Sequence, residues 1–113
     1  MERKIKTYGG YFANFMEKLT DKEQDKVQYA LLLLKTQKRV SIKFIKHIED
    51  GLYELRIEYS RNIYRVFFIF DEGDIVVLFN GFQKKSQQTP PEEIKKALII
   101  KKEYYADKQS QNR

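Results

Sequence analysis

Hydrophobic residues near the start of the chain repeat at helical intervals. A short extended segment, Ile5 to Tyr8, and the pair Gly9-Gly10 precede the first repeat. The spacing that follows predicts an amphipathic helix. Its buried stripe consists of Tyr11, Phe12, Phe15, Met16 and Leu19. The chain is therefore expected to open with an extended segment and then a helix.

A second helix is predicted directly after the first. Thr20 followed by Glu23 has the spacing of a capping box, in which each side chain bonds the backbone N–H of the other residue. The basic stretch from Lys35 to Arg39 suits the negative C-terminal end of a helix. The buried stripe between them is Val27, Ala30, Leu31 and Leu34. Because the connection is short, we expect the two helices to form an antiparallel hairpin.

From Leu52 onward the hydrophobic period changes to two, which is typical of strands. Three strands are predicted, from Leu52 to Tyr59, from Ile63 to Phe70 and from Ile75 to Phe82. Turn residues separate them, namely Ser60-Arg61-Asn62 and the four-residue turn Asp71-Glu72-Gly73-Asp74. These connections are too short for parallel crossovers, so the strands should form an antiparallel meander.

The chain closes with a predicted helix. Thr89 supplies an N-cap, and the prolines and Glu92 after it suit a first helical turn. The helix should run through Tyr105 and leave a polar tail, Asp107 to Arg113, that frays. The expected fold class is α+β: one small domain, residues 1–106, in which a helical hairpin packs on the meander and a helix closes the chain.

The register of the strands determines which charged side chains share a face. The apolar sides of the first two strands must coincide, which requires an even-numbered loop, most simply of two residues near Arg61-Asn62. Arg56 and Arg65 then lie on the same face as near neighbours. Pairing Phe70 with Ile75 across the acidic turn would place Asn80 opposite Arg65 and bring Phe82 and Lys84 to that side. One face should then be apolar and covered by the helices, and the other should be a floor that carries cations.

Composition narrows the function. The 113 residues include 22 Lys+Arg against 16 Asp+Glu, a net charge of +6, and the pI is about 9.4. A packed basic body, 42% hydrophobic, favours a polyanionic or acidic partner, although the charge could serve solubility alone. No cysteine is present, so disulfides and cysteine-based sites are excluded. The charged first residues and the lack of long apolar runs predict a cytoplasmic protein without a membrane segment.

An arginine within a strand as apolar as Ile63 to Phe70 needs an anion. Glu54 or Glu58 on the adjacent strand could supply this anion in a purely structural ion pair. Two arginines together with Lys84-Lys85 favour a phosphate site instead, because a guanidinium fork matches phosphate geometry. Phe67 and Phe82 on this face could stack a base, or could simply pack.

Few catalytic alternatives remain. His47 is the one histidine, without a partner for a zinc site, and the acidic turn is more typical of a solvated hairpin. Metal-free phosphodiester chemistry fits better, since fixed cations can stabilise a phosphorane and RNA supplies its own 2′-hydroxyl nucleophile. No metal or cofactor is expected.

Four segments together carry a family resemblance. They are Gly51-Leu52-Tyr53-Glu54-Leu55-Arg56, Asn62-Ile63-Tyr64-Arg65-Val66-Phe67-Phe68, Asn80-Gly81-Phe82-Gln83-Lys84-Lys85 and Thr89-Pro90. In this order they resemble the RelE/ParE toxin superfamily, specifically its phage-derived HigB-like branch. The resemblance covers nearly the whole chain and implies an N-terminal strand, two helices and an antiparallel sheet.

The resemblance also implies residue roles. Arg56 and Arg65 match the strand arginines of the family, and Lys84 or Lys85 matches the basic residue after the last strand. Glu54 stands where some relatives have a lysine, which makes Glu54 a candidate base. Several relatives use a Tyr or His close after the last strand, where this chain has Gln83, Ser86, Gln87 and Gln88. Lys84 or Lys85 is therefore the provisional acid. The predicted catalytic residues are thus Arg56, Arg65, Lys84 and Glu54, and the predicted RNA-binding residues are Lys85, Arg61, Phe82 and Asn80.

The resemblance implies a toxin of a type II toxin–antitoxin pair. Its activity would be mRNA cleavage, generally on the ribosome, and its partner an antitoxin that usually carries a helix-turn-helix domain. Two alternatives stay open at this point: a ParE-type toxin that poisons DNA gyrase, and a catalytically defective protein that only binds an antitoxin. The arginines at positions 56 and 65 and Lys84 favour the nuclease.

Overall fold

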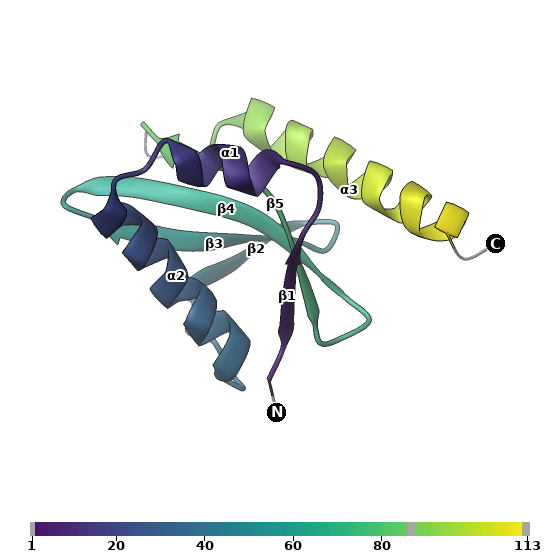
Figure 1. Ribbon diagram of the computed structural model, residues 1–113. Coiled ribbons are helices and arrows are strands. Elements are labelled where there is room, and N and C mark those ends of the chain that lie inside the picture. The colour runs from purple at the N-terminus through teal and green to yellow at the C-terminus, as the bar shows by residue number, and fades with distance from the viewer. Residues whose placement is uncertain (1, 86–87, 112–113) are drawn as a thin grey trace.

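Five strands form one mixed sheet in the order β1-β5-β4-β3-β2 (Figure 1). The computed structural model describes residues 2–85 and 88–111. The strands are β1 (Lys4–Thr7), β2 (Ile45–Glu49), β3 (Leu52–Tyr59), β4 (Asn62–Asp71) and β5 (Ile75–Lys84). The helices are α1 (Tyr11–Glu17), α2 (Asp21–Thr36) and α3 (Pro91–Gln111). The predicted α+β class is confirmed, and β3, β4 and β5 form the predicted meander.

The meander is extended at both edges. β1 pairs with β5 in parallel, and β2 pairs with β3 antiparallel. The sequence pattern did not predict β2, because only Ile45 and Ile48 of its five residues are apolar and the other three are exposed. An edge strand of this kind lacks the strict alternation that reveals a half-buried one.

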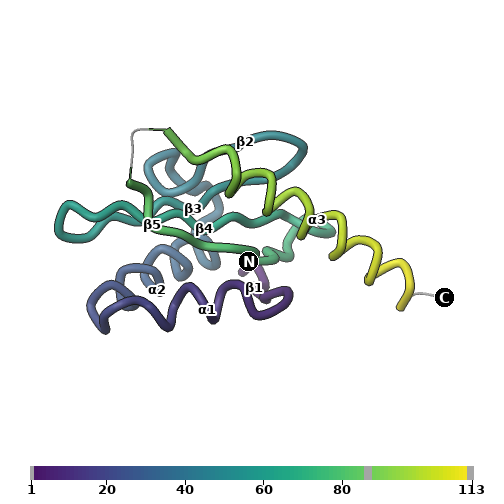
Figure 2. Tube along the Cα trace, turned by 90° about the horizontal axis from the view of Figure 1, so that it is seen from above, coloured from purple at the N-terminus to yellow at the C-terminus, as the bar shows by residue number. Residues whose placement is uncertain are grey.

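The helices lie in two layers, with α1 and α2 on one face of the sheet and α3 on the other (Figure 2). α3 covers a second apolar cluster that includes Leu52, Phe67, Ile69, Val77 and Phe79. The expectation of one covered and one open face was therefore wrong for this half of the sheet. Both sides of β4 are apolar here, and each side needs a helix to remove it from water.

α2 begins at the predicted capping box. The Thr20 hydroxyl accepts from the Glu23 backbone N–H at 3.2 Å, and the Glu23 carboxylate accepts from the Thr20 N–H at 2.8 Å. The helices do not form the expected hairpin along their lengths: α1 packs on β5 and α2 packs on β3. Gly81 permits the first contact, because a Cβ there would lie 2.6 Å from the Phe15 ring.

The β3–β4 hairpin has the predicted even-numbered loop. Tyr59 pairs with Asn62, so Ser60-Arg61 forms a two-residue turn, one residue earlier than expected. Both turn residues have positive φ, 50° and 73°, as the primed hairpin turns require. In this register Arg56 lies directly opposite Arg65.

The β4–β5 register differs from the prediction. Asp71 rather than Phe70 pairs with Ile75, because the turn is three residues long and Asp71 belongs to the strand. A β-bulge opposite Phe67 then shifts the pairing of β4 and β5 by one more residue. Arg65 consequently pairs with Phe82, and the two side chains share a face. Asn80 is therefore not opposite Arg65. Its amide donates instead to Glu93 of α3, at 3.3 Å to the backbone oxygen and 3.1 Å to the carboxylate.

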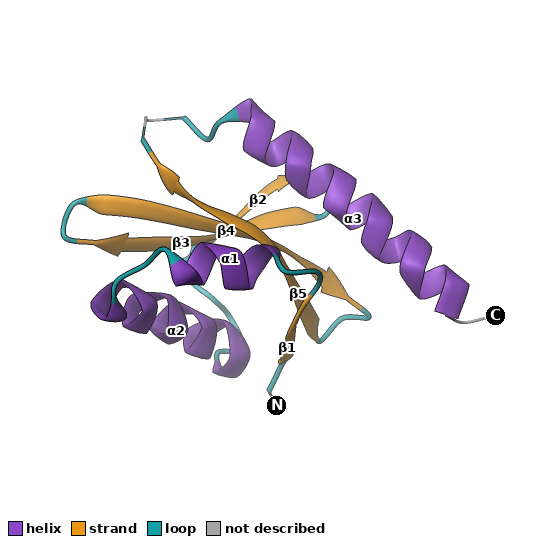
Figure 3. Ribbon diagram, turned by 45° about the horizontal axis from the view of Figure 1, so that its top comes forward, coloured by secondary structure: helices purple, strands orange, loops and turns teal. Residues whose placement is uncertain are grey.

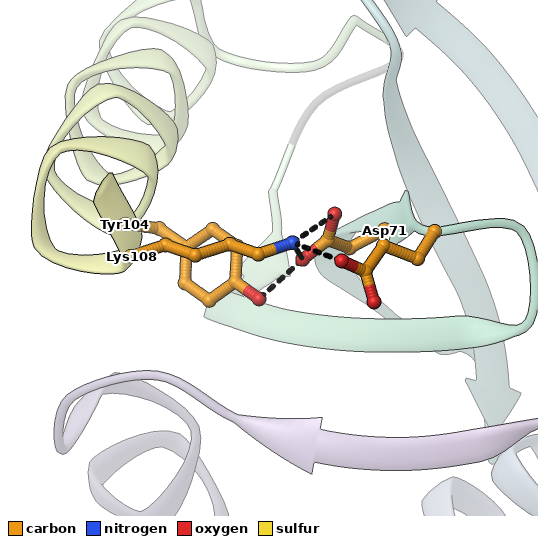
Figure 4. Close-up of polar contacts among 4 residues, drawn as sticks. Asp71, Tyr104 and Lys108 are labelled. Atoms are coloured by element: carbon orange, nitrogen blue, oxygen red, sulfur yellow. Dashed lines mark hydrogen bonds and ion pairs between the residues drawn. The ribbon is translucent and has the colours of Figure 1, made fainter. Parts of the chain in front are cut away.

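The C-terminal half of α3 is anchored to the β4–β5 turn. Asp71 accepts from the Tyr104 hydroxyl at 2.6 Å and from Lys108 Nζ at 2.8 Å, and Glu72 accepts from Lys108 at 3.0 Å (Figure 4). Tyr8 also donates to Asp107. The helix thus continues through Gln111, where the sequence predicted a fraying tail.

Asp71→Asn is expected to lower the free energy of unfolding at pH 7 by about 1.5–3 kcal/mol, the usual worth of hydrogen bonds to a charged group. Burial alone would raise the pKa of Asp71, but the bonds from Lys108 and Tyr104 outweigh it and hold the pKa below its ordinary value. A lowered native pKa stabilises above the unfolded value of about 3.9, and this contribution is lost as pH falls through the native pKa. Urea unfolding from pH 7 to pH 2 measures both effects. The matched control is Asp74→Asn in the same turn, and equal stability of the two variants at pH 7 would contradict the anchor.

Candidate functional site

A row of side chains crosses the sheet beside the part that α3 covers. Arg56 of β3, Arg65 of β4 and Phe82 of β5 are directly paired across neighbouring strands. Directly opposite residues point to the same face. On that face, the adjacent rows carry Glu54 on one side of the arginines and Lys84 on the other. The predicted grouping of these four charged residues is what the register produces.

One buried carboxylate lies between the two arginines. Glu54 is 1% exposed, and its Oε1 lies 3.4 Å from Arg65 Nε and 3.6 Å from Arg56 Nε. Its other oxygen accepts a hydrogen bond from the Thr89 hydroxyl at 3.3 Å, which ties the loop before α3 to the centre of the sheet. The internal partner that the sequence allowed is therefore present, but a single carboxylate serves two guanidinium groups.

The two arginines are ion-paired with Glu54 but incompletely hydrogen-bonded. Among the residues that the structure describes, neither Nε donates a hydrogen bond, although both atoms are buried. Arg65, 4% exposed, donates from Nη1 to the Tyr64 carbonyl at 3.1 Å, and Arg56 donates to the Ile42 carbonyl at 3.4 Å. Like charges directly opposite each other destabilise a sheet, and buried donors without acceptors add to that cost. The geometry leaves this place suited to an anion.

Lys84 completes the cation cluster, which we define as Arg56, Arg65 and Lys84. Burial lowers the pKa of Lys84, and the charge of Arg65 lowers it further while Glu54 opposes the shift. Burial likewise lowers the pKa of Arg65, with Glu54 again acting in the opposite direction. Both shifts arise mainly from burial, and repulsion between the cations of the cluster adds to them. A bound phosphate would favour the charged forms of these groups.

A comparison with protein families now bears on this site. The family described as phage-derived protein Gp49-like (DUF891) matches residues 14–102. The chain belongs to this family. The Gp49-like family is a RelE/toxin-like family, and the small α+β domain is consistent with a RelE-like fold. The matched range contains the whole cation cluster together with Glu54 and Thr89. No curated protein matches this Gp49-like chain.

Three of the four predicted RNA-binding residues of this Gp49-like protein line one groove. Lys85, Phe82 and Asn80 line a groove of about 580 Å³ at the edge of β5, whereas Arg61 lies in the β3–β4 turn. Asn80 is 2% exposed and holds the first turn of α3 through Glu93. Phe82 packs against Phe67, with ring centroids 5.5 Å apart. Ser86 and Gln87, which the family resemblance in the sequence pointed to, lie outside the described residues.

Sequence reasoning missed other residues near the site. Lys46 of β2 pairs with Glu54 and so shares its face, but this is visible only once β2 is known. The contact from Thr89 to Glu54 joins residues far apart in the chain, and no local pattern predicts it.

Within residues 2–85 and 88–111, no group of three or more metal-ligating side chains is present. No helix among those residues is long and apolar enough to cross a membrane.

Proposed function

We propose that this protein is the toxin of a type II toxin–antitoxin system and that it cleaves ribosome-bound mRNA without a metal ion. The observation that carries the proposal is the pair of arginines at positions 56 and 65. They lie directly opposite each other, share one buried carboxylate at ion-pair distance, and make no hydrogen bond through Nε within the described residues. A scissile phosphate would supply a second anion to two guanidinium groups that share a single carboxylate. Membership of a RelE/toxin-like family supports the same function.

In the proposed reaction the RNA 2′-oxygen attacks the neighbouring phosphorus, and the bond from phosphorus to the 5′-oxygen breaks. The products are a 2′,3′-cyclic phosphate and a 5′-hydroxyl. Arg56 and Arg65 stabilise the additional negative charge of the phosphorane. The 2′-hydroxyl proton leaves to solvent water, and Lys84 donates a proton to the departing 5′-oxygen. The lowered pKa of Lys84 makes it a better acid than an ordinary lysine.

Glu54 acts in this proposal by positioning. Its Oε1 faces both arginines, its Oε2 is bonded by Thr89, and the side chain is nearly inaccessible to solvent. Burial and engagement of both oxygens favour this role over the general base considered from the sequence. The carboxylate keeps two mutually repelling guanidinium groups at the spacing that a phosphate requires.

The proposed partner is a cognate antitoxin with a helix-turn-helix domain. A basic face that binds phosphate invites masking by an acidic segment of that protein. A small reading frame for such a protein beside this gene, and a stable complex of the two products on co-expression, would support the pairing.

Induction of the protein in bacteria is expected to stop incorporation of labelled amino acids before that of labelled thymidine, because mRNA cleavage halts translation first. Pulse-labelling after induction measures both rates, with an Arg56→Ala/Arg65→Ala variant as the inactive control. An early block of DNA synthesis with SOS induction would favour the gyrase-poisoning alternative. Growth without any arrest would favour the catalytically defective one.

A further inference from the structure

Two grooves flank the Arg56–Arg65–Phe82 row, one at each end. The β3 groove, of about 590 Å³, contains both arginines and is lined further by Lys26, Tyr29, Ala30, Lys43, Phe44, Ile57 and Glu58. The β5 groove, of about 580 Å³, contains Phe82, and its cations are Lys18, Lys85 and Lys96. The row thus joins two cavities at opposite sides of the three central strands.

The β3 groove forms because β2 stops short of the end of β3. Their pairing reaches Leu55, and one more bond runs from the Arg56 N–H to the Phe44 carbonyl. Beyond that point the groove is lined by Lys26, Tyr29 and Ala30. These residues belong to α2, which packs against β3 (Figure 3). Tyr29 is 53% exposed there. Apart from the site arginines, the groove contains two lysines, two aromatic side chains and a single carboxylate, Glu58.

The β5 groove lies between α1 and the first turns of α3. Its two carboxylates are already engaged: Glu23 by the Tyr64 hydroxyl and Thr20, and Glu93 by Asn80. The three lysines there are exposed, and Lys96 Nζ lies 5.7 Å from the centre of the Tyr11 ring. Both grooves thus combine aromatic side chains with a surplus of positive charge.

We propose that a single strand of RNA crosses the sheet along this row, from the β3 groove over the cation cluster to the β5 groove. This inference rests on the proposed function and specifies the path of its substrate. Strands lie about 4.8 Å apart, so the row spans roughly 10 Å between Arg56 and Phe82. Lysines at both ends hold the phosphates on either side of the bond that is cut. Aromatic faces that alternate with cations suit single-stranded nucleic acid of any sequence. Cleavage within an RNA strand requires that the protein bind the RNA on both sides of the scissile phosphate.

The test is binding of a fluorescent, uncleavable 12-nucleotide 2′-O-methyl RNA to the full chain, followed by anisotropy across a range of salt concentrations. Lys26→Glu/Lys43→Glu alters the β3 groove, and Lys18→Glu/Lys96→Glu alters the β5 groove. The matched control, Lys38→Glu/Lys102→Glu, makes the same change of charge at exposed positions outside both grooves. Each groove variant should weaken binding at least tenfold relative to the control. Each should also reduce the slope of log K against log[salt] by about 1.4, since each lost phosphate contact removes about 0.7.

A trinucleotide of the same chemistry separates the inference from the function on which it rests. It should bind the cation cluster equally in wild type and both groove variants, and bind weakly to Arg65→Ala. Groove variants that bind the 12-mer as the control does would overturn the RNA path. Groove variants that lose only the antitoxin would assign the grooves to protein binding and also overturn it. A wild-type protein that binds neither RNA would contradict the proposed function itself.

Discussion

Replacing Arg65 by alanine is expected to slow single-turnover cleavage of ribosome-bound mRNA by roughly 10²-fold or more, the loss typical of one preorganised charge donor. The same change should destabilise the fold. Arg65 is 4% exposed and lies 3.4 Å from the Glu54 carboxylate. Its removal therefore takes away one of the two cations that neutralise this buried carboxylate. This ion pair makes a lower thermal midpoint the expected result.

Stability and catalysis must therefore be measured on the same Arg65→Ala preparation, with the rate expressed per folded molecule. Arg65→Lys keeps the charge without the guanidinium fork and should recover only part of the activity. Arg39→Ala, an exposed arginine after α2, is the matched control and should cleave like wild type. A folded fraction of Arg65→Ala with full activity would remove Arg65 from the site.

Glu54→Gln is expected to lower the free energy of unfolding by about 3–5 kcal/mol, because it removes the one carboxylate between two opposed arginines. Cleavage per folded molecule should stay within about tenfold of wild type, since Glu54 positions the arginines and takes no proton. Inorganic phosphate should raise the thermal midpoint of this variant more than that of wild type, because phosphate replaces the missing negative charge.

The stability control for Glu54→Gln is Glu58→Gln, on the same face of the same strand but exposed. Glu58→Gln should unfold almost as wild type does. A Glu54→Gln protein that is fully stable yet cleaves 10²-fold or more slowly would contradict the positioning role and make Glu54 the general base.

The central part of the fold follows from local patterns. The boundaries of β3 were predicted to the residue, and those of β4 and β5 to within two residues at either end, because turn residues bound each of these apolar runs. The edge strand β2 was not predicted because its residues are mostly exposed. The length of α3 was underestimated because the contacts of Asp107 and Lys108 join it to residues distant in sequence.

The site was predictable to the same degree and for the same reason. Matching the apolar faces of the first hairpin was sufficient to bring Arg56 and Arg65 together. Asn80 was misplaced because a bulge and a three-residue turn shift the last strand, and sequence parity does not reveal either. In the sequence, the lysines and Tyr29 of the flanking grooves look like ordinary solvated surface residues. Only the tertiary arrangement places them beside the arginines.

The most direct measurement of the central claim concerns the nucleophile. Ribosomes are programmed with an mRNA that carries a single 2′-deoxynucleotide immediately 5′ of the scissile phosphate, and the products are compared with those of the all-ribose mRNA. If Arg56, Arg65 and Lys84 act on a phosphate attacked by its own 2′-oxygen, the ribose mRNA yields a 2′,3′-cyclic phosphate and the deoxy position stays uncut. Cleavage at the deoxy position, or products that end in a 3′-hydroxyl, would contradict the mechanism.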